Sequence, residues 1–197
     1  MARRFLVLGA TLVAAVLFAG AAMAAQVTIR VEGRTQSIFG SKPVTIDAAN
    51  ALQALDVAST LGEFYYGVTH SSFGDYVSQV GKYQGAGSAG WVFKVNGGSP
   101  PVGADQVQLK DGDAVLWYYA TFGATGGPPT LDLKALPGNC YSVTSYDDAG
   151  KASPAAGAVI HVDGRRIKVV DGKGCVGKHR GLVRAFSFGT VRSNSAK

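Results

Sequence analysis

Two cysteines carry the most specific chemistry in this 197-residue sequence. Cys140 and Cys175 can form one disulfide, which is the usual state of an even pair of cysteines in an exported protein. They could instead join His161 and His179 as metal ligands, because Cys175 and His179 are four residues apart. No Cys-x-x-Cys pair accompanies them, so the sequence favours a disulfide and we expect no metal site.

Side chains that could support catalysis stand in unfavourable local patterns. The run HSSFGD at 70–75 holds a histidine, two serines and an aspartate, but it lacks a nucleophile elbow. Asp111 and Asp113 flank a turn glycine, which is not the arrangement of a pair of glycosidase acids. The run GAGSAG at 85–90 has G-x-G-x-x-G spacing, yet a strand-like segment follows where a nucleotide site needs a helix. We therefore expect a protein that is not an enzyme.

Aromatic residues offer a better candidate site. The stretch 90–119 contains two tryptophans, two tyrosines and tight glycine turns. Trp91 and Phe93 fall on one face of a predicted strand, and Lys94 falls on the other face. Because a lysine favours water, we expect the face that carries Trp91 to be buried. The loop 99–101 (Ser-Pro-Pro) follows this strand and is expected to lie near Phe93.

Alternation also divides the aromatic residues of the next predicted strand. Val115, Trp117 and Tyr119 share one face, and Tyr118 lies on the other. We expect the first three to join the core and Tyr118 to be more exposed, where it offers a ring with a polar tip to a ligand. The alternative is that the tryptophans of this region simply fill the core of a small β domain.

The elements that must position these residues are mostly strands. Only the segment 48–62 has a convincing helical pattern, with Asp47 as its predicted N-cap and Gly62 as its C-terminal stop. Segments with alternating residues precede and follow this helix, and Asn-Gly and Asp-Gly turns occur between them. One helix on such a sheet predicts a β-grasp-like domain over 26–122, within a mainly β protein.

The chain beyond residue 122 is expected to form a second domain. Residues 123–130 have the glycine and proline composition of a linker. Short strands with turn signals about every ten residues predict a small Ig-like β-sandwich over 131–192. Residues 193–197 are polar and are expected to be a disordered tail.

Residues 1–25 have the features of a secretory signal peptide. Arg3 and Arg4 precede an apolar run, and the sequence AMA at 22–24 fits the small-x-small rule for cleavage. We expect cleavage after Ala24 or Ala25, location outside the cell or in the cell envelope, and membrane contact only through this peptide. The alternative is a membrane anchor, although the apolar run is short for one.

Charge is divided unevenly along the chain. Residues 26–125 hold six basic and eight acidic residues, whereas 126–197 hold eleven basic and five acidic ones. The positive excess suits an anionic partner such as a cell-wall polymer or a lipid surface, although a solvated basic face is the simpler interpretation. Aromatic and basic residues are concentrated in different halves, so we expect no nucleic-acid partner.

Several spaced motifs of the first half follow the order of a known family. They are the Gly90-Trp91 pair, the Asn96-Gly97 turn, the run VGAD at 102–105 and the KDGD turn at 110–113. With these motifs, residues 27–121 resemble the transcobalamin-like C-terminal domain of many secreted bacterial proteins. The same domain closes over the corrinoid in the vitamin B12 carriers transcobalamin and intrinsic factor. The resemblance implies a β-grasp-type fold of the ligand-binding kind, and the second half resembles the Ig-like domains that often accompany it.

The resemblance also implies where a ligand would bind, because the strand after the tryptophan and the loop that follows face the corrin in the carriers. With the exposed tyrosine added from strand alternation, the candidate ligand-binding residues are Trp91, Phe93, Ser99, Pro100, Pro101 and Tyr118. The helical barrel that holds the other side of the corrinoid is absent from this sequence. We therefore expect no tightly bound corrinoid and no other cofactor.

Together these patterns predict a secreted, two-domain, mainly β protein that binds a small molecule or a cell-surface polymer. The alternative is a structural or adhesive protein of the cell envelope without a small-molecule ligand. An exposed aromatic patch beside the loop 99–101 would favour binding. Full burial of Trp91 and Trp117 would favour the structural alternative.

Overall fold

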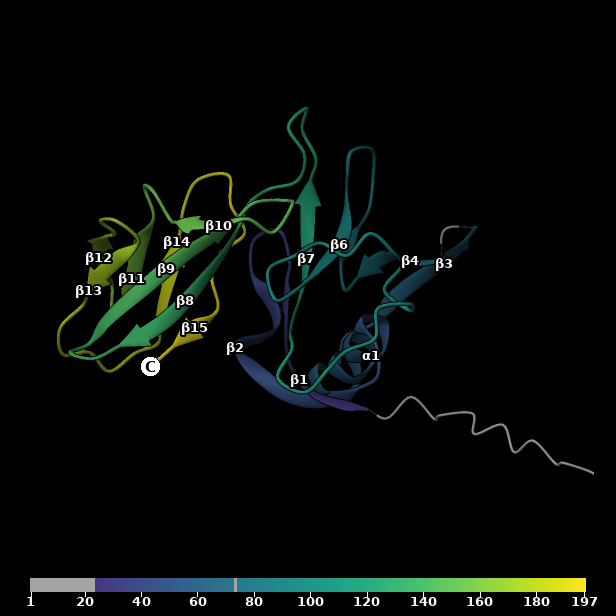
Figure 1. Ribbon diagram of the computed structural model, residues 1–197, viewed down its shortest axis with the longest axis horizontal. Coiled ribbons are helices and arrows are strands. Elements are labelled where there is room, and N and C mark those ends of the chain that lie inside the picture. Colours follow the sequence, from purple (N-terminus) through teal and green to yellow (C-terminus); the bar gives the residue numbers. More distant parts are fainter. Residues whose placement is uncertain (1–23, 73) are drawn as a thin grey trace, which may run out of the picture.

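The computed structural model describes residues 24–72 and 74–197. The described chain is mainly β, with one helix and two groups of strands that lie side by side (Figure 1). The N-terminal group comprises residues 25–121 and the C-terminal group residues 130–196. Most of the predicted signal peptide lies outside the described residues, but Ala25 begins the first strand, β1 (Ala25–Glu32).

A four-stranded mixed sheet forms the centre of the N-terminal group. Its order is β2-β1-β7-β6, in which β2 spans Ser37–Ala48, β6 spans Ala89–Val95 and β7 spans Ala114–Thr121. The central pair, β1 and β7, is parallel, and the outer strands are antiparallel to their neighbours. With one helix packed beside it, this sheet agrees with the predicted β-grasp-like plan.

The helix α1 (Ala51–Gly62) begins later than the sequence predicts. Asp47 lies in β2, where it pairs with Gln26, and a residue held in a strand ladder cannot cap a helix. Asn50 is the N-cap instead, and its side-chain oxygen accepts a hydrogen bond from the Gln53 N–H at 2.8 Å. One face of the helix is buried against the sheet. This face consists of Ala51, Ala54, Leu55 and Ala58.

A smaller antiparallel sheet extends the N-terminal group. Its strands are β3 (Tyr66–Ser71), β4 (Gly74–Val80) and β5 (Tyr83–Gln84). Val77 and Val80 of β4 belong to the same hydrophobic core as Trp91 and Trp117. The core of the N-terminal group is therefore built from the central sheet, the helix and β4.

The C-terminal group is a sandwich of two four-stranded sheets. In one sheet β9 pairs with β8, β10 and β13, and the order in the other is β12-β11-β14-β15. Leu131, Ile160 and Val183 lie in a hydrophobic core that is separate from that of the N-terminal group. The strands are β8 (Thr130–Leu136), β9 (Cys140–Tyr146), β10 (Ala152–Pro154), β11 (Val159–Val162), β12 (Arg165–Lys168), β13 (Lys173–Cys175), β14 (Val183–Phe186) and β15 (Ser195–Ala196).

Cys140 and Cys175 form the predicted disulfide. The antiparallel pairing of β13 with β9 places the two cysteines directly opposite each other. Because both sulfurs are used in the bridge, neither thiolate is available to a metal in this state. The disulfide ties two neighbouring strands of one sheet together.

The last residues are ordered, so the predicted disordered tail over 193–197 is wrong. Ser195 and Ala196 form β15, which pairs with β14. Ser193 is fully buried, and its Oγ accepts a hydrogen bond from the Ala185 N–H at 2.8 Å. The polar composition of this segment predicts fraying, but strand pairing and this hydrogen bond hold it in the sandwich.

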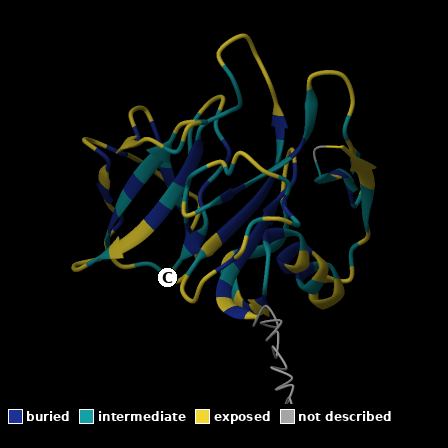
Figure 2. Ribbon diagram, turned by 45° about the vertical axis from the view of Figure 1, so that its right-hand side comes forward, coloured by how far each residue is buried: buried dark blue, intermediate teal, exposed yellow. Residues whose placement is uncertain are grey.

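Both faces of the central sheet are covered, whereas strand alternation predicts that one face is in water. The helix and β4 cover the face that carries Trp117. The C-terminal group covers the other face, on which Arg30, Leu116 and Lys94 form one row across β1, β7 and β6. Figure 2 shows how burial is concentrated in the strands between these two layers.

Lys94 and Tyr118 are therefore buried, and the prediction that they are exposed is wrong. Their exposed fractions are 0% and 1%. The Lys94 ammonium donates hydrogen bonds to the backbone oxygens of Tyr146, at 3.3 Å, and of Asp147. Burial lowers the pKa of Lys94. Tyr119, which was expected in the core, is only partly buried at its margin.

Glu32 lies at the centre of a buried ion cluster between the two groups. Its fully buried carboxylate contacts Arg30 at 3.2 Å and Arg192 at 3.5 Å, and it also pairs with Arg184 of β14. The Ser37 hydroxyl donates to both carboxylate oxygens, at 3.2 and 3.0 Å. Since Arg184 and Arg192 come from the C-terminal group, the cluster fixes how the two groups sit against each other.

Candidate functional site

A cavity of about 310 Å³ lies along the outer edge of β6. This strand is the last one in the central sheet, so no strand of that sheet pairs with its outer side. The cavity is lined by β4, β6, β7, the loop after β6 and two residues near the junction with the C-terminal group. The lining residues are Asp75, Tyr76, Val77, Trp91, Val92, Phe93, Ser99, Pro100, Gly103, Ala104, Trp117, Tyr118, Phe122 and Asp148.

Five of the six predicted ligand-binding residues line this cavity. They are Trp91, Phe93, Ser99, Pro100 and Tyr118. The turn after β6, in which the Val95 N–H bonds the Gly98 carbonyl at 2.9 Å, reverses the chain before the loop 99–101. The sixth residue, Pro101, is exposed and is not part of the lining.

The two tryptophans are anchored in the core and offer little surface to a ligand. Trp91 is 3% exposed and Trp117 is 2% exposed. The indole N–H of Trp91 donates to the Tyr83 carbonyl at 2.7 Å, and that of Trp117 donates to the Ala51 carbonyl at 3.0 Å. Phe93 is partly buried, with its ring centroid 5.0 Å from that of Trp117. Both tryptophans are therefore buried, which favours the structural alternative over ligand binding.

The exposed rings of the cavity belong to two residues that sequence reasoning missed. Tyr76 of β4 is 47% exposed, and Phe122, just after β7, is 36% exposed. These two rings form an aromatic rim beside Pro100. An exposed aromatic patch next to the loop 99–101 is what favours ligand binding. Alternation with the buried Val77 could have placed Tyr76 outward. Phe122 carries no periodic signal, because it follows the end of its strand.

The phenol of Tyr118 is the cavity's most unusual polar group. Its Oη is buried and has no hydrogen-bond partner among the described residues. Burial raises the pKa of Tyr118, the charge of Asp148 raises it further, and the Ser99 hydroxyl, which is near the phenol but not in hydrogen-bond geometry with it, lowers it. Because Ser99 and Asp148 both line the cavity, we place the hydroxyl end of Tyr118 at the cavity wall. A buried hydroxyl without a partner costs about 1–3 kcal/mol.

Two carboxylates complete the polar lining. Asp148, in the turn after β9, accepts a hydrogen bond from the Gly127 N–H at 3.2 Å. Asp75 of β4 pairs with the exposed His70, whose Nδ1 is 2.6 Å from the carboxylate. The cavity therefore combines aromatic rings with acceptor oxygens, and Asp148 is contributed by the C-terminal group.

Close packing of two turns holds Asp148 at the cavity. Gly97 has φ +84°, and a Cβ at this position would lie 2.5 Å from a ring carbon of Tyr146. A Cβ on Gly150 would lie 2.7 Å from the Cα of Gly98. The turn after β6 and the turn that contains Asp148 can approach this closely only because both carry glycine.

Most of this cavity lies in a segment that is similar to a known family. Residues 48–121 match DUF4430, a domain of unknown function. The DUF4430 segment supplies every lining residue except Phe122 and Asp148. No curated protein matches the chain.

The solved structures that match this chain include one that is weakly similar to it. It is a crystal structure of a candidate metal-binding protein from Ruminococcus gnavus, with 17% sequence identity and a TM-score of 0.37, and the match covers 48% of this chain and 95% of that one. Within residues 24–72 and 74–197, no three His, Cys, Asp or Glu side chains are placed to hold a metal together.

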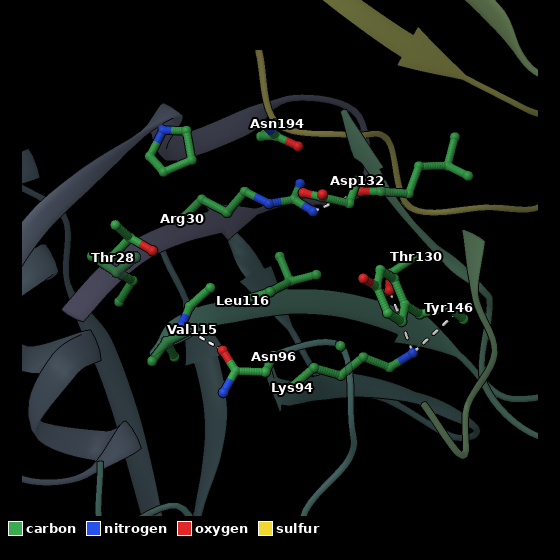
Figure 3. Close-up of a pocket in the computed structure, with 15 residues that line it drawn as sticks. Thr28, Arg30, Lys94, Asn96, Val115, Leu116, Thr130, Asp132, Tyr146 and Asn194 are labelled. Carbon is green, nitrogen blue, oxygen red and sulfur yellow. Dashed lines mark hydrogen bonds between the residues drawn. The ribbon is translucent and has the colours of Figure 1, made fainter. Parts of the chain in front are cut away.

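A second cavity, of about 260 Å³, lies between the central sheet and the C-terminal group (Figure 3). Arg30 of β1 and Lys94 of β6 reach along it from the two strands that flank β7. Their cationic groups already have oxygen partners: Arg30 donates to the carbonyls of Leu131 and Arg192, each at 2.9 Å, and Lys94 donates to that of Tyr146. These groups connect the two halves of the molecule, so the cavity at the β6 edge is the better candidate site.

Proposed function

We propose that this chain is a secreted binding module without enzymatic activity, and that its small-molecule ligand occupies the cavity at the β6 edge. The buried, unpartnered hydroxyl of Tyr118 beside an exposed aromatic rim is the observation that carries this proposal. A ligand that bonds this hydroxyl supplies a partner that the free protein lacks.

The resemblance of residues 27–121 to transcobalamin-like C-terminal domains points to the same region. In the vitamin carriers, the strand after the tryptophan and its following loop face the corrin. The corresponding residues Phe93, Ser99 and Pro100 line the cavity here. A corrinoid therefore belongs in a ligand screen, together with haem and cell-wall glycans.

The alternative function is a structural or adhesive protein of the cell envelope. Burial of Trp91 and Trp117 supports it. An exposed basic surface on the C-terminal group supports it as well and would suit an anionic cell-surface polymer. That surface comprises Arg165, Arg166, Lys168, Lys173, Lys178 and Arg180.

A ligand found in this screen is expected to change tryptophan fluorescence, because Trp91 and Trp117 line the cavity. We expect Phe122→Ala to weaken binding about tenfold, since it removes a rim contact, and to leave stability almost unchanged because the ring is partly exposed. Affinity would be measured by calorimetric titration of the mature protein.

The matched control for this test is Phe188→Ala, the same change at an exposed ring outside the cavity lining. It should leave affinity unchanged. A ligand whose affinity is the same with and without the Phe122 ring would not occupy this cavity. If no member of the panel binds, the structural alternative is favoured.

Export is a further part of the proposal. The disulfide is compatible with an oxidising compartment outside the cell. Among residues 24–72 and 74–197, no helix has the length and apolar character that a membrane span needs. Ala25 pairs with Ala48 in the sheet, so cleavage after Ala24 would leave β1 whole.

Mass spectrometry of the exported protein is expected to show a chain that starts at Ala25 or Gln26, because the signal peptide is removed after the small residues Ala24 or Ala25, at the start of β1. The protein would be collected from the medium and from the cell envelope separately. Recovery of a chain with intact Met1 from the membrane fraction would contradict cleavage and support the anchor.

A further inference from the structure

The charged residues that line the β6-edge cavity all have the same sign. They are Asp75 and Asp148, and no lysine, arginine or histidine is part of the lining. Lys94 is the cation whose pKa responds to Asp148, but its ammonium donates to backbone oxygens and the two residues form no ion pair. Asp75 is paired with His70, so the negative charge that has no ion-pair partner among the described residues is that of Asp148.

One carboxylate oxygen of Asp148 is free to accept a hydrogen bond at the cavity. Its Oδ2 accepts the hydrogen bond from Gly127, and its Oδ1 receives none from the described residues. The negative charge of Asp148 raises the pKa of the Tyr118 phenol. A carboxylate with a free oxygen and a buried hydroxyl without a partner thus line the same cavity.

Aromatic rings stand at the mouth of the same cavity. Tyr76 and Phe122 are exposed, and Phe93 is partly buried behind them. The face of an aromatic ring attracts a cation, most strongly where water is partly excluded. Rings and carboxylates together favour a positively charged ligand over a neutral one, and they disfavour an anion.

We propose that the ligand of this cavity is an organic cation that carries a protonated amine on an apolar skeleton. This inference rests on the proposed binding function. The ammonium donates hydrogen bonds to Asp148 Oδ1 and to Tyr118 Oη, which satisfies both groups at once. The apolar skeleton packs against Tyr76 and Phe122 at the rim.

A pair of matched probes tests the charge. At neutral pH, 2-phenylethylamine is protonated, and 2-phenylethanol is a neutral molecule of nearly the same shape. We expect the amine to bind the mature protein at least about tenfold more tightly than the alcohol, because charge-assisted hydrogen bonds are about twice as strong as neutral ones. Calorimetric titration would measure both affinities.

Three variants locate the effect. Asp148→Asn keeps an oxygen for Gly127 but removes the charge, and it should reduce the preference for the amine to within about twofold. Asp147→Asn is the matched control, because this neighbouring acid is exposed and lies outside the lining, and it should keep the preference. Tyr118→Phe should weaken the amine about fivefold without lowering the thermal stability, since it removes a hydroxyl that has no partner in the free protein.

The outcomes separate this inference from the proposed function. Equal affinity for amine and alcohol, a preference that survives Asp148→Asn, or no binding of either probe would overturn the organic-cation inference. If a ligand without a protonated amine, from the glycan, haem and corrinoid screen, still binds through Phe122, the proposed binding function stands without the organic-cation inference. A preference that disappears only in Asp148→Asn supports both.

Discussion

Replacing Glu32 by glutamine is expected to lower the free energy of unfolding by about 3–5 kcal/mol, because it leaves buried cations without their counter-ion. Glu32 is fully buried and pairs with Arg30, Arg184 and Arg192. Burial lowers the pKa of Arg30 and of Arg184, and the charge of Glu32 opposes this shift in both. A glutamine of nearly the same shape keeps the space filled, but it removes the charge and replaces one acceptor oxygen by an NH2 group that cannot accept a hydrogen bond.

Urea unfolding of the oxidised protein would measure this change. Glu63→Gln is the matched control, since Glu63 is an exposed acid at the end of α1, and its effect should stay within about 0.5 kcal/mol. Because Arg184 and Arg192 belong to the C-terminal group, amide exchange at the interface should also become faster in Glu32→Gln. A loss of less than about 1 kcal/mol would mean that water or other oxygens compensate the arginines, contrary to this prediction.

Trp117→Ala is expected to cost about 3–5 kcal/mol, because it removes a large side chain from the centre of a packed core. The indole is 2% exposed, and its N–H bonds the carbonyl of Ala51 at the start of α1, at 3.0 Å. Its ring also packs against Phe93, with 5.0 Å between the centroids. The substitution therefore leaves a cavity and also removes a hydrogen bond between β7 of the sheet and the helix α1.

Tyr118→Phe in the adjacent position is the control for Trp117→Ala in the same denaturant experiment. It keeps the ring and removes only an unpartnered hydroxyl, so stability should stay the same or rise by about 1 kcal/mol. Strand alternation alone predicts that Tyr118→Ala is inexpensive. Since Tyr118 is 1% exposed, we now expect its truncation to cost about as much as that of Trp117. Unchanged stability of Trp117→Ala would contradict the assignment of this tryptophan to the core.

Local patterns of the sequence determined much of the fold. Alternation placed Trp91 and Trp117 on one buried face, because successive side chains of a strand must point to opposite sides. The expected export and the presence of only two cysteines predicted the disulfide, because two cysteines allow a single pairing. The helix was predicted one turn too early, because Asp47 and Asn50 have the same capping chemistry and only the extent of β2 decides between them.

Only the tertiary structure decided what covers the second face of the central sheet. Alternation assigns Lys94 and Tyr118 to that face, but it carries no information about which distant segment packs there. The C-terminal group supplies backbone oxygens for Lys94 and covers Tyr118, so a face that is expected in water becomes an interface. For the same reason Asp148, which lies far along the chain from β6, could not be assigned to the candidate site from the sequence. Contacts of this kind depend on how two groups with separate hydrophobic cores meet, and residue spacing does not encode that arrangement.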